Sequence, residues 1–537
     1  MPRRPFLRHV VVFIGFLCLA AAITYPQIVG AGNAVPFHSD PYFSMWRLGW
    51  VAHQLPRDPR ALFEANIFYP EHDTLAYSDA MLLPATVLAP LFWVGVDPVA
   101  IYNGALFAAL TLSGFTAFLL ATRLSGSEVG GLVAGVIFAF APYHIDHYLH
   151  FELQMVFWIP LALLAVHHLI AEARIRDGVL FGAAVAAQTL SCMYAAVFFV
   201  TYCALFIPLL ASVGTARASL RLVAPLIIAA ALALAIAAPY SLAYARAERT
   251  VGTRSLDDVA HYSASFVNYI AAPPSNRLYG SLSARFGSDE LYLFPGIVAV
   301  LLAALGVLRG HGRARLAYAG GLVLAFEMSR GVNGLTYPLL FQHVPPFQAF
   351  RSAARIGILV NLSIAVLSAY GTAWLLPRIR SHGWRLTAAA VIVTALVAEY
   401  ASAPAAALAP RPAAVDRWLA RQPPVVVVQL PMTRDWLYMY QGIAHAQKML
   451  NGYSGFPPAS YYATRDAMRS FPDDSSIAYL QARNVDYVIV RGEQYPAEDR
   501  AALVAKIENR RDVSLVARFP QDGSEDSVFA VLKPGRR

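Results

Sequence analysis

The stretch VVVFIGFLCLAAAITYPQI at residues 10–28 is the first of many long apolar runs, and the acidic motif HSDPY follows it at residues 38–42. A run of this length matches the roughly 20 apolar residues that a helix needs to cross a bilayer. The chain of 537 residues is 57% hydrophobic and only 14% charged, with a mean hydropathy of +0.49. Soluble proteins carry about 25% charged residues. The composition therefore predicts a polytopic α-helical protein of the lipid bilayer, and it excludes a disordered protein and a nucleic-acid binder.

The basic residues and the cysteines give no sign of a cofactor. Of the 42 basic residues 39 are Arg, which indicates codon bias more than a binding surface. Cys18, Cys192 and Cys203 lie in apolar stretches, without C-x-x-C or zinc-binding spacing. We therefore expect neither a disulfide framework nor a metal or other cofactor.

Eleven stretches have the length and apolarity of membrane spans. They are residues 10–28, 99–121, 128–143, 153–170, 178–194, 195–212, 222–240, 293–308, 315–330, 355–376 and 385–402. A further apolar stretch, 80–96, contains Pro84 and Pro90. If 80–96 lies at the interface without spanning, most loop arginines fall on one side of the membrane. They are Arg3, Arg4, Arg8, Arg123, Arg174, Arg176, Arg217, Arg221, Arg309, Arg313, Arg315, Arg378, Arg380 and Arg385.

Because cytoplasmic loops are rich in arginine and lysine, this distribution predicts a cytoplasmic N-terminus and an extracytoplasmic C-terminus. Residues 10–24 have an alternative interpretation as a cleaved signal peptide, which would leave the later topology unchanged. The outer loops are then 29–98, 241–292 and 331–354, and the first of them is long enough to suggest function.

From about residue 404 the pattern changes to alternating helices and strands, after an Ala/Pro-rich linker at 403–414. This pattern predicts a small extracytoplasmic α/β domain. We therefore expect two domains, a membrane domain over 1–403 and the α/β domain over 404–537.

Asp40 is the leading catalytic candidate, because a carboxylate just outside the membrane can act as general base on an acceptor hydroxyl. The alternative is a helix N-cap, since Asp followed by Pro is a common helix start. Asp79 ranks second and also resembles a cap, ahead of the 80–96 helix. The acids of the Tyr69–Asp73 turn are expected to be solvated.

Two further clusters lie at predicted outer ends of spans. In HIDHYLHFE (144–152) three histidines recur at i, i+3 and i+6, with His144, Asp146 and His150 as candidate sugar or phosphate contacts. Metal binding and simple interface packing are the alternatives. In FRSAAR (350–355), Arg351 and Arg355 are spaced i, i+4 and could clamp a phosphate from one helix face. Snorkelling, or an ion pair with a loop acid, is the alternative.

Less specific signals come from the second outer loop and the tail. Arg246, Arg249 and Arg254 add positive charge near the outer surface, and Tyr262 could contact sugar hydroxyls. Residues 445–456 of the tail include Asn-Gly and Ser-Gly turn signals, which fit a plain turn or a loop that contacts carbohydrate.

Together these features resemble the GT-C superfamily of membrane glycosyltransferases, and in particular a group of poorly characterised bacterial GT-C-like proteins. The resemblance covers most of the chain. It rests on Asp40-Pro41 with Trp46 and Trp50, Ala65–Pro70, Thr74–Asp79, Tyr102-Asn103, Phe140–His150, Trp158–Leu161, Phe294–Gly296, Phe350-Arg351, Arg355 and Asn451–Gly455.

The resemblance implies an enzyme that transfers a sugar from a polyprenyl-phosphate-linked donor, on the outer face of the cytoplasmic membrane and in the cell envelope. Asp40 would be the base, and the acceptor would be a glycan, a lipid or a protein. Tyr42 stands where the mannosyltransferases have a second acid, and the D-x-D metal motifs of oligosaccharyltransferases are absent, so a divalent metal is not favoured. The rival hypotheses are a GT-C-like scaffold without activity, or a transporter or flippase of lipid-linked glycan.

Overall fold

The computed structural model describes residues 3–213, 219–521 and 523–533, and its chain divides into two compact units. Arg217, one of the loop arginines considered above, lies outside the described residues. We call the two parts the helical unit and the mixed unit. The helical unit comprises Met1–Phe37, Val99–Tyr240 and Thr253–Leu408. The mixed unit comprises His38–Pro98, Ser241–Gly252 and Ala409–Arg537.

The chain is a multi-pass helical membrane protein. Within the described residues, eight helical stretches are long and apolar enough to span a membrane. They are Phe6–Ile23, Pro98–Ser125, Glu128–Leu149, Phe151–Glu172, Met193–Val213, Leu220–Val251, Ala353–Arg378 and His382–Tyr400. The three other predicted spans form the shorter helices α9 (Ile175–Ser191), α14 (Ile297–Arg309) and α15 (Ala314–Ser329). The number of spans and their direction therefore stay predictions.

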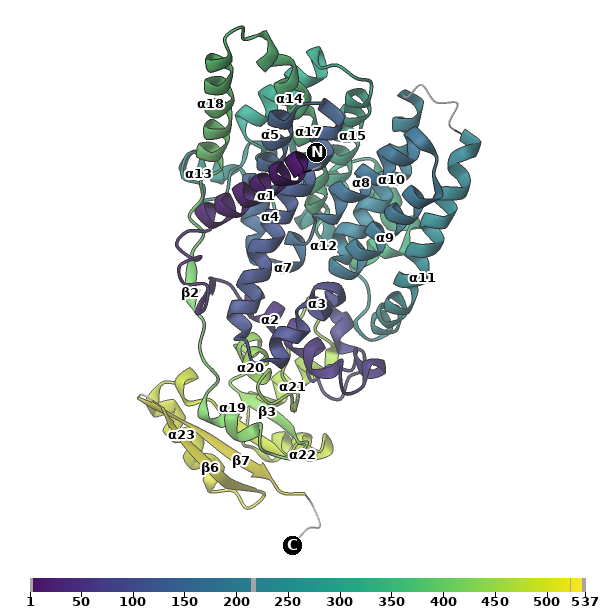
Figure 1. The fold of residues 1–537 in the computed structure, drawn as a ribbon. Coiled ribbons are helices and arrows are strands. Elements are labelled where there is room, and N and C mark those ends of the chain that lie inside the picture. The colour runs from purple at the N-terminus through teal and green to yellow at the C-terminus, as the bar shows by residue number, and fades with distance from the viewer. Residues whose placement is uncertain (1–2, 214–218, 522, 534–537) are drawn as a thin grey trace. The chain divides into compact units, whose positions relative to one another are not determined.

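Helix α17 (Gly357–Leu375) is the core of the helical unit, where α5 (Glu128–Phe140), α14 and α15 pack around it (Figure 1). The apolar stretch Ala353–Arg378, which contains α17, has 94% of its membrane-spanning residues buried. Glycines permit the close contact with α14: a Cβ on Gly306 would lie 2.0 Å from the Leu367 carbonyl oxygen, and one on Gly371 would lie 2.0 Å from that of Leu302. Small residues let helix backbones approach in this way.

The C-terminal part of the mixed unit is a five-stranded mixed sheet in the order β4-β3-β5-β7-β6. Strand β3 (Val426–Leu430) pairs in parallel with β4 (Lys448–Met449) and β5 (Tyr487–Val490). Strand β7 (Ser524–Val531) is antiparallel to β5 and to β6 (Val513–Gln521). The run of valines in β3 is mostly buried, as expected of a central parallel strand. The predicted α/β character of this part is confirmed.

The first loop packs with this sheet in the mixed unit, although the predicted boundary at residue 403 groups it with the membrane helices. The Phe68 N–H donates to the Asn451 carbonyl at 3.1 Å, and the Met449 N–H donates to the Asn66 carbonyl at 2.8 Å. The loop therefore continues the sheet beyond β4. It also contains α2 (Asp40–Gln54).

Helix α3 (Leu82–Trp93) occupies the stretch that we expect at the membrane interface. It is only 12 residues long and contains Pro90, so it is too short to span. Ala85 and Ala89 are buried, whereas Val87 and Trp93 are exposed. An apolar exposed face of this kind is what an interfacial helix presents to lipid.

Replacing Gly371 by Ala tests the close contact of α14 and α17. Its methyl group would meet the Leu302 backbone, and overpacking of this kind costs about 1–3 kcal/mol. We expect a lower midpoint of thermal unfolding in detergent micelles. The control is Gly104→Ala in α4 (Pro98–Ser125), where the methyl group would meet nothing within 4 Å. Equal midpoints for the two variants would contradict the packing described here.

Candidate functional site

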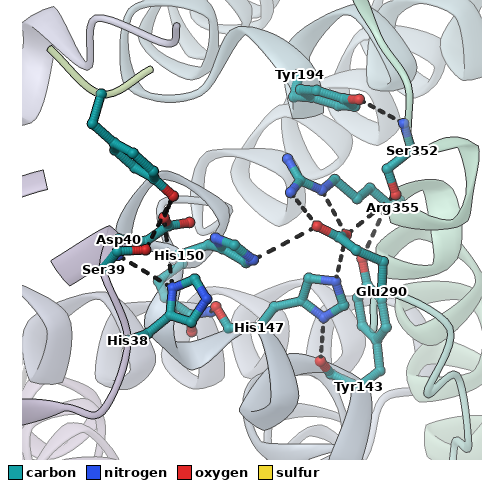
Figure 2. Close-up of polar contacts among 12 residues, drawn as sticks. His38, Ser39, Asp40, Tyr143, His147, His150, Tyr194, Glu290, Ser352 and Arg355 are labelled. Atoms are coloured by element: carbon teal, nitrogen blue, oxygen red, sulfur yellow. Dashed lines mark hydrogen bonds and ion pairs between the residues drawn. The ribbon is translucent and has the colours of Figure 1, made fainter. Parts of the chain in front are cut away.

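Asp40 is the first residue of α2, and its carboxylate faces a tyrosine from the C-terminal domain (Figure 2). The Tyr453 hydroxyl donates to Asp40 Oδ1 at 2.9 Å and lies 3.0 Å from the Ser39 hydroxyl. His38 Nδ1 lies 3.5 Å from Asp40 Oδ1, and the Asp40 side chain is 20% exposed. The N-cap position belongs to Ser39, so the alternative that Asp40 is the N-cap is wrong. Asp40 is a partly exposed carboxylate in the first helical turn.

Asp79 does not cap a helix either. The N-cap of α3 is Met81, at φ 50°, and the Asp79 carboxylate accepts from the Met81 N–H at 3.4 Å. The backbone around Asp79 is firmly held, because its carbonyl accepts from the buried Arg47 at 2.7 Å. The Tyr244 hydroxyl bonds to the residues on either side, Ser78 O and Ala80 N–H.

The expectation of solvated acids in the Tyr69–Asp73 turn is wrong for Asp73. Asp73 is buried and accepts two hydrogen bonds from Arg246, at 2.7 Å from Nε and 2.6 Å from Nη2. Arg246 binds Asp73 through two hydrogen bonds and lies more than 170 positions away in the sequence. The local sequence of the turn could not indicate so distant a partner.

The three histidines at 144–150 do not share one helix face, contrary to the spacing argument. The chain forms α6 (Pro142–Asp146), then a 3-10 turn over His147–Leu149, and is extended at His150. The Gln154 side chain braces this turn, because its Nε2 donates to the carbonyls of His144, at 3.3 Å, and His147, at 2.9 Å. His144 bonds to the Phe138 carbonyl at 3.1 Å, whereas His147 turns towards Glu290.

Glu290 is the centre of the polar cluster in the helical unit (Figure 2). It accepts from Arg355 Nε at 2.8 Å and again from Arg355 Nη2. His147 Nε2 lies 3.0 Å from Oε2, His150 Nε2 lies 3.6 Å from Oε1, and the Ser352 hydroxyl donates at 3.2 Å. The Glu290 side chain is 10% exposed.

The electrostatics of this cluster keep Glu290 ionised. Burial by itself would raise the pKa of Glu290, but the charge of Arg355 and the hydrogen bonds from Arg355 and His147 outweigh it. The pKa of Glu290 is therefore held well below its ordinary value. We call Glu290, Arg355, His147, His150 and Ser352 the Glu290 cluster.

Arg351 and Arg355 do not project from one helix face. Arg355 lies in a 3-10 turn, Ala353–Ile356, and Arg351 precedes that turn, so the expected i, i+4 helical geometry is absent. Arg355 adopts the alternative of an ion pair with a loop acid, Glu290. Arg351 is exposed, and its guanidinium carbon lies 5.1 Å from the centre of the Tyr262 ring.

A second arginine, Arg254, lies close to Arg351. Burial, and then the charge of Arg351, lower the pKa of Arg254. The Asp258 carboxylate lies near both arginines, so one negative and two positive charges leave a net positive charge beside the half-buried Tyr262. An anion would relieve the repulsion between the two arginines.

Sequence reasoning missed Glu290 and Arg47. Glu290 adopts a left-handed backbone at φ 68°, in a short turn closed by the Leu291 N–H and the Ser288 carbonyl. A single acid in a long loop resembles any solvated acid until its partners are known. Asp146 is half-buried beside the cluster. Over the described part of the chain, no group of three or more His, Cys, Asp or Glu side chains is arranged to hold a metal.

Replacing Glu290 by Gln tests how much the ion pair contributes to the free energy of unfolding. The change leaves the charge of Arg355 buried without a counter-charge, which costs about 3–5 kcal/mol. We expect a large loss in the free energy of unfolding, measured by denaturant titration in detergent micelles. Because folding lowers the pKa of Glu290, this stabilisation is present at neutral pH and is lost as the pH falls through the folded value.

The control for that experiment is Glu128→Gln. Glu128 pairs with Arg8 at 3.4 Å on the surface, where both side chains are more than 60% exposed. Exposed pairs contribute little to stability, so this variant should unfold nearly as the wild type does. A Glu290→Gln variant that is as stable as Glu128→Gln would contradict the structural role of the cluster.

Comparison with known proteins gives a fold but no close relative. No protein-family model and no curated protein matches the chain. The arabinofuranosyltransferase AftD from Mycobacteria is similar in structure, with a TM-score of 0.61 and 15% identity. The match covers 100% of this chain, which spans 40% of the length of AftD.

Two further solved structures are similar at lower scores. ArnT from Cupriavidus metallidurans, bound to undecaprenyl phosphate, has a TM-score of 0.49 and 11% identity over 99% of this chain and 98% of that chain. The oligosaccharyltransferase AglB from Archaeoglobus fulgidus, in complex with an inhibitory peptide and a dolichol-phosphate, has a TM-score of 0.47 and 13% identity over 90% of this chain and 69% of that chain. The fold assignment rests on the AftD match: the chain has the fold of this arabinofuranosyltransferase, and at the level of the fold the predicted resemblance is confirmed.

Proposed function

We propose that this protein is a glycosyltransferase that moves a sugar from a polyprenyl-phosphate-linked donor to an acceptor hydroxyl. The observation that carries the proposal is the Asp40 carboxylate, partly exposed in the first turn of α2 and bonded by Tyr453, in a chain with the fold of AftD. The acceptor is a glycan, a lipid or a protein. The reaction takes place at the outer face of a bacterial cytoplasmic membrane, as part of cell-envelope synthesis.

Asp40 acts as the base in this proposal. Tyr453 donates to Oδ1, and a carboxylate has enough lone pairs to accept a second proton donor. The acceptor oxygen attacks the anomeric carbon, its proton passes to Asp40, and the bond from that carbon to the phosphate oxygen breaks. Polyprenyl phosphate leaves with the electron pair, and a single displacement inverts the anomeric configuration.

Arg351 binds the donor phosphate in this proposal, with Arg254 beside it. An arginine is always charged and offers a planar set of donors that suits phosphate. Arg351 is exposed over the Tyr262 ring, whereas Arg355 is committed to Glu290. We therefore assign Arg355 the task of holding the residues before α17, including Arg351, in place.

The remaining predicted contacts keep their proposed roles in sugar and acceptor binding. His150 and the half-buried Asp146 belong to the turn that His147 ties to Glu290. A small cavity borders the buried His144, together with His147 and Arg355. Asp79 lies in the same unit as Asp40. We propose that His144, Asp146, His150 and Tyr262 line the sugar pocket, and that Asp79 contacts substrate.

For the topology we propose about eleven spans, with a cytoplasmic N-terminus and an extracytoplasmic C-terminal domain. The short helices α9, α14 and α15 would complete the spans, and the loop arginines support the direction. We propose no metal and no other cofactor.

The acids of the predicted spans argue against transport. Glu399 accepts from the Ile297 N–H at 2.7 Å and the Val298 N–H at 3.1 Å, so it caps α14. Glu327 likewise accepts from the Thr336 N–H at the start of α16 (Thr336–His343), at 3.1 Å. Carboxylates at helix N-termini stabilise the helix, so structure accounts for both acids without a transport pathway.

Replacing Asp40 by Asn tests the base. We expect a loss of about 10²–10⁴-fold in the transfer rate, because the amide cannot accept the hydroxyl proton. The assay uses purified protein in lipid nanodiscs and radiolabelled polyprenyl-phosphate sugars. Arabinofuranose belongs in the panel because AftD is an arabinofuranosyltransferase.

The matched control is Glu71→Gln, another half-buried acid of the same loop, which should transfer at the wild-type rate. Full activity of the Asp40→Asn variant, with an unchanged unfolding midpoint, would remove Asp40 from catalysis. Neither binding nor turnover of any donor by the wild type would favour the scaffold hypothesis.

Replacing Arg351 by Gln tests the phosphate contact. Loss of one charge-assisted hydrogen bond should raise the KM for donor by about 10–100-fold, with a smaller effect on kcat. The dependence of that KM on salt should also weaken. The control is Arg277→Gln, an exposed arginine in the same unit. An equal change of KM in both variants would refute a specific role for Arg351.

A further inference from the structure

The hydrogen bond between Tyr453 and Asp40 joins residues that lie 413 positions apart, one in the C-terminal domain and one in the first loop. We propose that Tyr453 is a positioning residue for the Asp40 carboxylate, and that a buried Asp435–Asn451 pair holds Tyr453 in place. This inference rests on the proposed function and extends it, because it makes the C-terminal domain a part of the catalytic apparatus.

The position of the Tyr453 side chain is determined at both ends. Its hydroxyl lies between Asp40 Oδ1, at 2.9 Å, and the Ser39 hydroxyl, at 3.0 Å (Figure 2). Its ring meets the Phe43 ring edge-on, with centroids 5.5 Å apart. A tyrosine that only filled space would not need a carboxylate at its hydroxyl. Here that hydroxyl holds one oxygen of Asp40 and so fixes the orientation of the carboxylate.

Asn451 fixes the backbone that carries Tyr453. It is fully buried, and its side-chain amide bonds to both backbone groups of Gln429 in β3: Nδ2 donates to the carbonyl at 2.9 Å and Oδ1 accepts from the N–H at 2.7 Å. The amide therefore replaces the next backbone pair of β4. The Asn451 carbonyl accepts from the Phe68 N–H of the first loop at 3.1 Å.

Asp435 completes this network from the start of α20 (Asp435–Gly442). One oxygen accepts from Asn451 Nδ2 at 2.8 Å and the other from the Tyr461 hydroxyl at 2.6 Å. Burial raises the pKa of Asp435 to about 6, against the two hydrogen bonds and the charge of Arg465, so it is mainly ionised at neutral pH. With both oxygens bonded, Asp435 is not placed to react, and its role is to orient Asn451.

Close packing at Gly452 also restricts the backbone conformation of the loop that carries Tyr453. A Cβ at Gly452 would lie 2.4 Å from the Phe68 ring. The residue between Asn451 and Tyr453 is therefore pressed against the first loop. The Ser454 hydroxyl donates to the Tyr77 carbonyl at 2.8 Å on the other side of Tyr453. Both flanks of Tyr453 are thus tied to the loop that contains Asp40.

The test is the Tyr453→Phe variant of the full-length protein, which removes one oxygen and keeps the ring. A hydrogen bond to a carboxylate lowers its pKa, so its loss should raise the pKa of Asp40 and move the acidic limb of the pH–rate profile up by about one unit. The transfer rate should fall about 10–100-fold, with a smaller change in the KM for donor. The control is Tyr462→Phe, an exposed tyrosine of the same domain, which should leave both quantities unchanged.

A second readout needs no turnover. The carboxyl stretch of Asp40 is isolated as the infrared difference between each protein and its Asp40→Asn variant. It is titrated in two backgrounds, with Tyr453 and with Tyr453→Phe. His38 Nδ1 lies 3.5 Å from Asp40 Oδ1, and the Tyr453 hydroxyl donates to the same oxygen. His38 is common to both backgrounds, so a shift between them reports Tyr453. We expect a higher pKa of Asp40 in Tyr453→Phe, and the same shift in Asn451→Ala.

The outcomes separate the two proposals. A shifted titration without transfer of any donor would support the role of Tyr453 and overturn the proposed function. An unshifted titration together with an unshifted pH–rate profile in Tyr453→Phe would overturn the positioning role, whatever the activity of the wild type. If Asn451→Ala fails to fold, the Tyr453→Phe result decides alone.

Discussion

The buried ion pair between Glu290 and Arg355 joins parts of the helical unit that lie far apart in the chain. A charge in a membrane protein interior is costly unless it is paired and hydrogen-bonded, and Glu290 receives two bonds from Arg355 and further contacts from His147, His150 and Ser352. These partners come from two segments, 147–150 and 352–355, so that with Glu290 three separate segments of the chain meet. The pair therefore fixes the second loop, the histidine turn and the segment before α17. Arg351 belongs to that last segment, so the pair also fixes its position.

The carboxylates of Glu290 and Asp40 differ in burial and in the partners described for them. Glu290 is nearly buried, and cationic and hydroxyl donors surround it, so its pKa stays low and it is a poor proton acceptor. Asp40 is 20% exposed, and a neutral hydroxyl donates to it. We therefore propose Asp40 as the base, and Glu290 as the counter-ion that holds Arg355. In the mixed unit Asn451 also joins separate segments, because its side-chain amide bonds β3 to the loop that carries Tyr453.

Features that depend on local composition could be predicted from the sequence, and features that depend on distant partners could not. The apolar runs indicated a multi-pass membrane protein, and the alternation of helices and strands after residue 404 indicated an α/β part. The spacing of Arg351 and Arg355 suggested one helix face, but the backbone there is extended and then 3-10, because Arg355 turns to Glu290. Asp73 resembled a solvated turn acid until Arg246 was placed beside it. Glu290 carried no local signal at all.

The central claim is that this chain transfers sugars by a single displacement from a polyprenyl-phosphate donor. The measurement that tests it most directly is the anomeric configuration of the product, determined by NMR after incubation of the protein in nanodiscs with a panel of such donors and glycan, lipid and peptide acceptors. We expect release of polyprenyl phosphate in step with a glycosylated product of inverted configuration. A product of retained configuration would contradict the single base at Asp40, and no release from any donor would contradict the assignment as a transferase.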